Sequence, residues 1–345
     1  MGARSNTPVR DASAWTGADL ARSDAWIYRL AAPQLREIEA ALRHARALAK
    51  PLAMLVKENF PLGSLAADLD LLDREISDGR GFVLLRGLDL AHYTKADAAI
   101  LLFGLGTYFG RAISQNAFGD MLGHVRDQGV KLGQKDVRGY DSTSQLRFHN
   151  DECDIVGLLC LKKSKSGGLS SIVSSAQVFN QILAHHPQHL AQLFEGYIFS
   201  LMGEHRPGVG PVSDHRIPIF SSQDGKLSCR YTLNTIYQAT QYNGIALTAD
   251  EQAALDCVLA TANQPGMALD MTFEPGDIQL VSNHVCLHSR TEYVDHDEPE
   301  RKRHLLRLWL AAHRVRPLAP EFEQRFNDGY SFRRGVPVTR QRGIA

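Results

Sequence analysis

Two ionisable residues, His149 and Asp151, stand two positions apart just before an apolar run. In an extended segment, residues i and i+2 point to the same side, so both side chains could bind one metal ion. Two imidazoles and one carboxylate on one face hold a mononuclear Fe(II) and leave positions open for a co-substrate and O2. The pair therefore predicts an iron site if a second histidine approaches from elsewhere in the chain.

The second histidine is expected after a tight turn at 275–277 that leads into a short strand. His284 and His288 both lie in this region. We select His288 as the ligand, because a strand that contains arginines follows it in the sequence. We expect His284 to have a structural role.

That strand, over 301–310, places Arg303 and Arg307 four residues apart in an apolar run, so that both face the same side. A buried guanidinium is costly unless it pairs with an anion. A dicarboxylate held through two hydrogen bonds would be such an anion. The alternative, that both arginines form surface ion pairs, is disfavoured by their apolar neighbours.

These residues occur in a fixed order together with Gly167-Gly168-Leu169-Ser170, which lies between the first pair and the second histidine. The ordered set resembles the TauD/TfdA (taurine dioxygenase-like) family of Fe(II)- and 2-oxoglutarate-dependent dioxygenases. The resemblance covers roughly residues 80–312. It implies a double-stranded β-helix, which is a jelly-roll barrel, with helices on its flanks.

The resemblance also implies roles for the matching residues. Three would hold the iron and form the catalytic centre: His149, Asp151 and His288. Arg303 would bind the distal carboxylate of 2-oxoglutarate, with Ser170 assisting. Arg307 would serve either that co-substrate or an anionic group of the substrate.

Residues that could contact the substrate lie ahead of the iron pair and far beyond it. The candidates are Gln115, Asn116, Phe118, Asn234 and Tyr237, with Arg307 as a further one. The segment Tyr140–Ser144 is a candidate lid. For each of these residues the ordinary alternative is a polar or apolar surface position in a loop.

The secondary structure expected to position these residues changes along the chain, from mainly helices in its first part to mainly short strands after about residue 151. Helices are expected at 33–48, 65–77 and 95–109, and a strand at 81–87. From about residue 151, short apolar runs alternate with Gly, Pro, Ser and Asp, which is typical of a β-core. These runs are 155–161, 171–174, 217–220, 268–273, 278–281 and 304–311, with helical patches at 175–184, 188–195 and 249–263.

The expected fold class is therefore mainly β with flanking helices (α+β). Residues 1–30 are predicted to be a loosely held, flexible N-terminal arm. Residues 31–345 are predicted to form a single dioxygenase domain, with a helical part at 31–110 and a jelly-roll core at about 80–315.

The composition of the 345 residues points away from macromolecular partners. Lys and Arg balance Asp and Glu at 38 each, so no overall field favours nucleic acid or a membrane surface. No stretch approaches the roughly 20 apolar residues that cross a bilayer, and the N-terminus has no apolar signal core. Five cysteines without a CxxC motif suit a reducing cytoplasm. We expect a small-molecule substrate and a cytoplasmic protein, with a homo-oligomer left open.

The predicted activity is hydroxylation of a small organic molecule with release of succinate and CO2. The substrate could carry a carboxylate, and amino-acid derivatives or secondary metabolites would fit. Alternatives are desaturation, cyclisation or epimerisation on the same fold, a non-catalytic metal-binding jelly-roll protein, and a zinc hydrolase. The last leaves Arg303 without a role, and Asp151 argues against halogenation because halogenating relatives lack this carboxylate.

Overall fold

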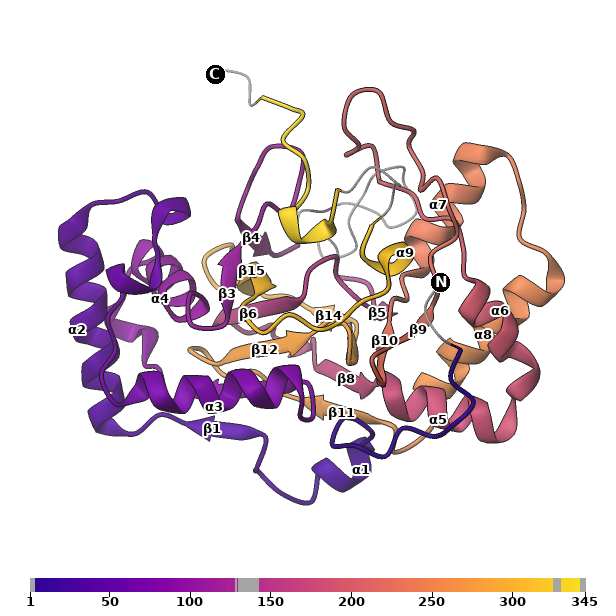
Figure 1. Ribbon diagram of the computed structural model, residues 1–345. Coiled ribbons are helices and arrows are strands. Elements are labelled where there is room, and N and C mark those ends of the chain that lie inside the picture. Colours follow the sequence, from indigo (N-terminus) through magenta and orange to yellow (C-terminus); the bar gives the residue numbers. More distant parts are fainter. Residues whose placement is uncertain (1–3, 128, 130–142, 325–329, 342–345) are drawn as a thin grey trace.

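The computed structural model describes residues 4–127, 129, 143–324 and 330–341. Two β-sheets face each other in the middle of the molecule (Figure 1). The larger sheet has the order β1 (Ile27–Arg29), β2 (Phe82–Arg86), β12 (Ile278–Ser282), β6 (Ile155–Lys162), β15 (His304–Ala312) and β3 (Gly110–Ala112), with β4 (Leu122–Val125) also paired to β15. The smaller sheet has the order β11 (Ala268–Met271), β8 (Ser170–Ser174), β13 (Cys286–Arg290) and β5 (Leu146–His149).

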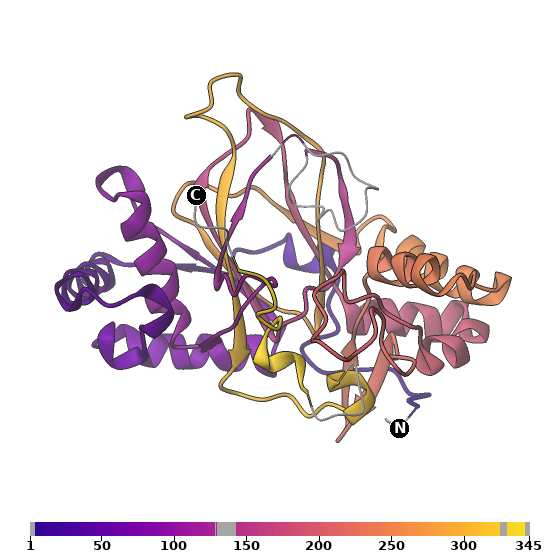
Figure 2. The same ribbon diagram turned by 90° about the horizontal axis from the view of Figure 1, so that it is seen from above.

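Helices cover the outer face of each sheet, and Figure 2 shows one group on either side of the strands. The larger sheet is covered by α2 (Ala32–Leu48), α3 (Leu65–Ser77) and α4 (Lys95–Gly106). The smaller sheet is covered by α5 (Ser175–His185), α6 (Leu190–Glu195), α7 (Leu233–Asn243) and α8 (Ala249–Ala262). Shorter elements are α1 (Gly17–Leu20), α9 (Pro320–Glu323) and the paired strands β7 (Ser166–Gly167) with β14 (Tyr293–Val294) and β9 (Phe220–Gln223) with β10 (Lys226–Cys229).

Alternation along β15 separates the helical core from the space between the sheets. Leu306, Leu308 and Leu310 belong to the core under α2–α4. Leu305 and Trp309 belong to the core between the sheets. Since successive side chains of a strand point to opposite faces, Arg307 shares the inner face with Leu305 and Trp309.

Helices α4 and α8 each begin at a threonine that caps the first turn. In α4, the Thr94 side chain accepts a hydrogen bond from the Asp97 amide, and the Asp97 carboxylate accepts one from the Thr94 amide. In α8, Thr248 and Glu251 form the same reciprocal pair. Such pairs satisfy amides that have no partner inside the helix, and so they define where each helix begins.

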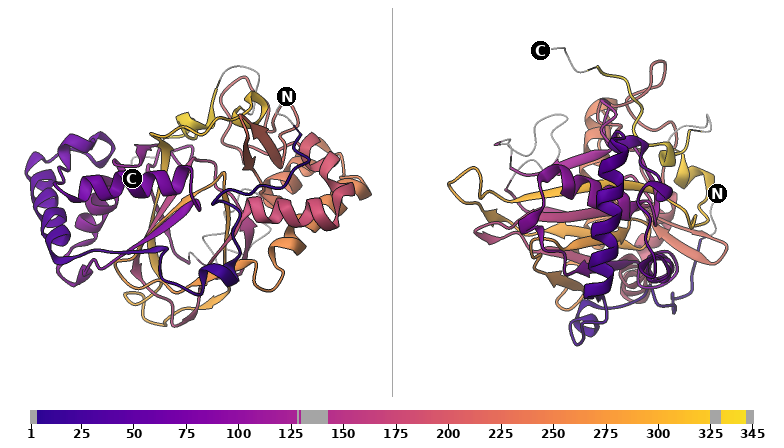
Figure 3. Two further views of the ribbon diagram at one scale, coloured as in Figure 1. Left: turned by 60° about the horizontal axis from the view of Figure 1, so that its bottom comes forward. Right: turned by 90° about the vertical axis from the view of Figure 1, so that its left-hand side faces the viewer.

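The segment before α2 differs from the predicted loose arm. Trp15 and Trp26 are buried between the sheets, and β1 pairs in parallel with β2. The Trp15 indole donates a hydrogen bond of 2.8 Å to the carbonyl of Arg80. Residues 15–30 are therefore packed on the core, because Trp15 and Trp26 are large apolar side chains that are buried between the sheets. Figure 3 shows the ribbon of this N-terminal segment running alongside the strands.

Most predicted helices and strands coincide with observed ones to within a few residues. The strand predicted at 217–220 is wrong, because Ile217 forms only an isolated bridge to Tyr197 and β9 begins at Phe220. Pro218 explains the difference, since proline has no N–H to donate to a ladder. Helix α7 was not among the predicted helices. Within the described residues, no helix is both long and apolar enough to span a bilayer.

Candidate metal centre and substrate cavity

His149 and His288 are direct partners across two antiparallel strands. His149 is the last residue of β5, and His288 lies opposite it on β13. Their ring centroids are 4.3 Å apart. Asp151 follows β5, and ligand atoms of the three residues all lie within 4.8 Å of one another. The structure thus brings together the three residues predicted to hold the metal, while His284 is not part of this cluster.

Both imidazoles are in a state that suits metal binding. His149 Nδ1 lies 2.8 Å from the carbonyl of Arg147, which can only accept, so Nδ1 carries a proton and Nε2 is the nitrogen that can face a metal. Burial and the neighbouring His149 lower the pKa of His288 to about 3, so its ring is neutral at pH 7. Its buried Nδ1 has no hydrogen-bond partner among the described residues.

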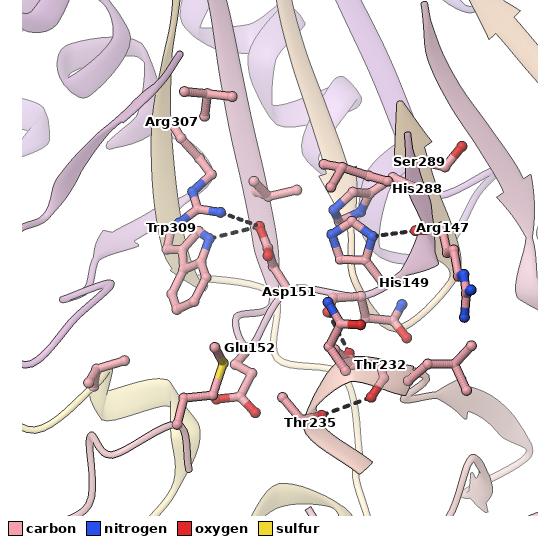
Figure 4. A pocket seen from close by; sticks show the side chains of 18 of the residues that line it. Arg147, His149, Asp151, Glu152, Thr232, Thr235, His288, Ser289, Arg307 and Trp309 are labelled. Carbon is pink, nitrogen blue, oxygen red and sulfur yellow. Dashed lines mark hydrogen bonds and ion pairs between the residues drawn. The ribbon is translucent and has the colours of Figure 1, made fainter. Parts of the chain in front are cut away.

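The Asp151 carboxylate is held by neighbours on β15. Trp309 Nε1 donates to Asp151 Oδ2 over 2.9 Å, and Arg307 Nη1 lies 3.4 Å from the same oxygen (Figure 4). Burial raises the pKa of Asp151, but Arg307, the two imidazoles and the Trp309 indole outweigh burial and lower that pKa to about 2. The carboxylate is therefore ionised at neutral pH, as a metal ligand must be.

A cavity of about 620 Å³ opens beside this cluster. Arg303 lines one part of it, is 6 % exposed, and has an Nη1 without a hydrogen-bond partner among the described residues. Ser170 lines the same part, and its Oγ donates to Gln279 Oε1 over 3.3 Å. Gly168 has φ of +71°, which favours glycine, and a Cβ there would lie 2.9 Å from Ser164 Oγ and 3.4 Å from Arg303 Nε.

A second buried arginine stands beside Arg303. The guanidinium groups of Arg290 and Arg303 lie 4.7 Å and 5.1 Å from the centroid of the same Tyr293 ring. Burial and the nearby Arg303 lower the pKa of Arg290 to about 10. Arg290 was not predicted, although its position two residues after His288 on a strand was a usable signal. This end of the cavity is strongly cationic and suits a carboxylate.

Arg307 is already engaged with protein groups. Its Nε donates to Gln115 Oε1 over 2.8 Å, in addition to its contact with Asp151. Gln115 is 2 % exposed and donates to the carbonyls of Met121 and Arg307. Gln115 therefore orients Arg307 and does not line the cavity, which corrects its predicted role as a substrate contact.

Two other predicted substrate contacts lie away from the cavity wall. The Asn116 side chain closes a turn by accepting from the Phe118 amide and donating to Asp120. Phe118 is 42 % exposed. Neither residue lines the cavity, whereas Asn234 and Tyr237 on α7 do. Residues 140–142 of the proposed lid lie outside the described part of the chain.

The chain near its C-terminus supplies a wall that the sequence analysis did not predict. The wall residues are Tyr330, Phe332, Gly335, Val336 and Pro337. The amide and carbonyl of Val336 bond to the carbonyl and hydroxyl of Ser114. Local patterns gave no signal for this wall, because the contact spans more than two hundred residues of sequence.

A buried charge network anchors this wall close to the segment that carries His149 and Asp151. Arg333 Nε lies 3.1 Å and 3.0 Å from the two carboxylate oxygens of Asp154. His284 Nε2 lies 2.8 Å from Asp154 Oδ1. Burial lowers the pKa of His284, so a neutral imidazole donates to the ionised carboxylate. In this network His284 contacts Asp154 and lies outside the cluster of the three candidate ligands.

Comparisons with known proteins identify the family of the chain. The sequence model described as "Taurine catabolism dioxygenase TauD, TfdA family" matches residues 47–309. The chain belongs to the TauD/TfdA family. Members of this family are Fe(II)- and 2-oxoglutarate-dependent dioxygenases, and the cluster of two histidines and one aspartate fits their iron.

Curated relatives within the TauD/TfdA family cover most of the chain. FR-33289 synthase of Streptomyces rubellomurinus is 32 % identical over 307 residues, which are 88 % of this chain and 90 % of that protein. The taurine hydroxylase-like protein SAT17 of Stachybotrys chartarum is 30 % identical over 311 residues, which are 87 % of this chain and 79 % of that protein.

Solved structures show the same TauD-like fold of mixed helices and sheets. Asparagine oxygenase in complex with Fe(II), 3-hydroxyasparagine and succinate matches with a TM-score of 0.64 at 17 % identity, over 83 % of this chain and 93 % of that one. The non-heme iron oxygenase OrfP with Fe and alpha-ketoglutaric acid matches with a TM-score of 0.61 at 14 % identity, over the same shares. Because the sequence identities to these two structures are low, the structural match shows a shared fold only.

Proposed function

We propose that this protein hydroxylates a small organic molecule, with conversion of 2-oxoglutarate and O2 to succinate and CO2. One observation carries the proposal. A convergent set of two histidines and one aspartate shares a cavity with a buried arginine, Arg303, whose Nη1 is unpartnered among the described residues. A zinc hydrolase would use the ligands but would leave Arg303 without a function.

In this proposal, iron is held by His149, Asp151 and His288, and it activates O2 when bound. Arg303 binds the distal carboxylate of 2-oxoglutarate. Ser170 assists as a hydroxyl donor. Arg290 lies opposite Ser170 in the β13–β8 pair and is a second cation at the end of the cavity that Arg303 lines. The cavity of about 620 Å³ is larger than a five-carbon dicarboxylate needs, so a substrate can lie beside it.

The proposed substrate is an anionic small molecule, such as an amino-acid derivative or a secondary metabolite. Asparagine oxygenase and OrfP have been solved with hydroxylated amino acids, which supports an amino-acid-like substrate. Asn234 and Tyr237 line the cavity and offer neutral polar contacts, and Arg307 would meet an anionic group of the substrate alongside its contacts with Gln115 and Asp151. The hydroxylation outcome is favoured over chlorination because Asp151 occupies the third ligand position.

The proposed architecture is a double-stranded β-helix, or jelly roll, in a single domain that extends beyond the predicted boundary at residue 31 to include Trp15 and Trp26. Two mostly antiparallel sheets with a shared inner core support this assignment. The packed strand β1 places residues before 31 on the same core.

The test is a substrate panel read by succinate release. Purified protein is incubated with Fe(II), 2-oxoglutarate and O2, together with proteinogenic amino acids, their N-acyl derivatives, sulfonates and nucleotides. The proposal predicts succinate above the substrate-free background and a product 16 Da heavier than one panel member, as one inserted oxygen atom requires. Turnover that persists without O2 and 2-oxoglutarate would instead support a hydrolase.

A further inference from the structure

Trp309 is an inward-facing residue of β15 whose indole meets a predicted iron ligand. It is 3 % exposed and belongs to the core between the sheets. Its Nε1 donates to Asp151 Oδ2 over 2.9 Å, a normal length for a hydrogen bond to a carboxylate. Figure 4 shows the indole and the Arg307 guanidinium approaching this oxygen from the same strand, on the side of Asp151 away from the histidines.

Resting on the proposed function, we propose that Trp309 is a positioning residue that fixes Asp151 as a one-oxygen iron ligand. A carboxylate on a short side chain can rotate and bind a metal through one or both oxygens. The bond from Trp309 engages Oδ2, so the rotation is restricted and Oδ1 is the oxygen presented to the metal. Binding through one oxygen keeps a coordination position open for the co-substrate or O2.

Trp309 performs this function better than Arg307, although both approach the same oxygen. The Arg307 contact is 3.4 Å, which is long for a hydrogen bond between charged groups, and its Nε is directed to Gln115. The Arg307 guanidinium also lies 4.9 Å from the Trp309 ring centroid, so the indole supports the arginine from one face. Loss of the indole N–H therefore removes the shorter of the two bonds to Asp151.

The alternative is that Trp309 serves only as a large apolar core residue. The chain contains a matched control for this alternative, since Trp26 is 8 % exposed in the same core and its Nε1 has no partner among the described residues. A change from tryptophan to phenylalanine removes the same atoms at both positions. Only at Trp309 does the change also remove a hydrogen bond to a metal ligand.

The first experiment compares Trp309→Phe with Trp26→Phe in the full chain. Anaerobic titration calorimetry with Fe(II) alone should show about tenfold weaker binding for Trp309→Phe and wild-type binding for Trp26→Phe. The nitrosyl complex of the Fe(II)- and 2-oxoglutarate-loaded protein should change its electron paramagnetic resonance spectrum only in Trp309→Phe. Wild-type affinity and an unchanged spectrum in Trp309→Phe would overturn the inference.

A second measurement uses the wild-type protein, so it does not depend on the folding of a variant. Zn(II) serves as a diamagnetic probe, and the indole N–H resonances of the three tryptophans are assigned in ¹⁵N-labelled protein. Zn(II) should shift the Trp309 indole resonance and leave those of Trp15 and Trp26 in place. An unmoved Trp309 resonance in Zn(II)-loaded protein contradicts the inference. Wild-type protein that binds neither Fe(II) nor Zn(II) contradicts the proposed function itself.

Discussion

His149 and His288 face each other across one strand pair, so the loss of either imidazole removes a ligand without breaking a backbone hydrogen bond. We expect His149→Ala and His288→Ala to abolish stoichiometric Fe(II) binding in anaerobic calorimetry. His284→Gln is the control, because glutamine can still donate to Asp154 and His284 lies outside the cluster. Loss of Fe(II) binding in a folded His284→Gln variant would show that the wrong histidine has been chosen.

Arg303 offers the corresponding test for the co-substrate. We expect Arg303→Ala to raise the 2-oxoglutarate concentration for half-maximal succinate formation about tenfold to a hundredfold, because a hydrogen bond to a charged group contributes about 1.5–3 kcal/mol. Fe(II) affinity should stay close to wild type. Arg301→Ala is the matched control, since Arg301 is exposed and pairs with Glu298. An unchanged 2-oxoglutarate requirement in Arg303→Ala would refute the assignment.

Sequence patterns predicted the site residues to different extents. The spacing of His149 and Asp151 and the alternation around Arg303 and Arg307 are local properties, and the structure places these residues on one cavity. The positions of Gln115 and Trp309 depend on long-range pairing of β15, which no short pattern encodes. Their contacts with Arg307 and Asp151 could therefore be found only in three dimensions.

At the scale of elements, α3 carries a buried acid that couples stability to pH. Asp73 is 4 % exposed, and burial raises its pKa to about 6 against the opposing effect of Arg314, which lies 3.0 Å away. A carboxyl whose pKa is higher in the folded state than in the unfolded state contributes stability that is fully present below its unfolded-state pKa. This contribution is lost as the pH rises through about 6.

We therefore expect Asp73→Asn to lose less stability than wild type between pH 4 and pH 7, by up to about 3 kcal/mol in urea denaturation. Asp70→Asn is the control with the opposite sign, because hydrogen bonds from Arg314 and Arg74 lower the pKa of this exposed residue. Identical pH profiles for Asp73→Asn and wild type would contradict the effect of burial.

The short helical turn at Phe332–Arg334 is a second element with a testable anchor. Removal of the Arg333 side chain leaves the buried Asp154 carboxylate without its cation, and breaking a buried pair in this way costs about 3–5 kcal/mol. We expect Arg333→Met to lower the free energy of unfolding and to speed amide exchange in residues 330–341. Arg334→Met, at an exposed position, should do neither. Equal exchange in the two variants would show that Arg333 is not the anchor.

At the scale of the whole molecule, the order of helices and β-core followed from the change in sequence texture near residue 151. The apolar runs of β6 and β12 were recognisable because both strands are covered on two faces. Two features were not predictable: the burial of Trp15 and Trp26, and the wall formed by residues 330–337. Both depend on segments near the chain ends packing on a core that is built by distant residues.

The central claim is that one ferrous ion binds where β5 and β13 meet, with 2-oxoglutarate reaching towards Arg303. The most direct measurement is an anomalous difference map at the iron edge, from crystals loaded anaerobically with Fe(II) and 2-oxoglutarate. We expect one iron peak in bonding contact with His149, Asp151 and His288, and a carboxylate of the keto acid on the Arg303 guanidinium. An iron peak at any other group of side chains, or a keto acid bound away from Arg303, would contradict it.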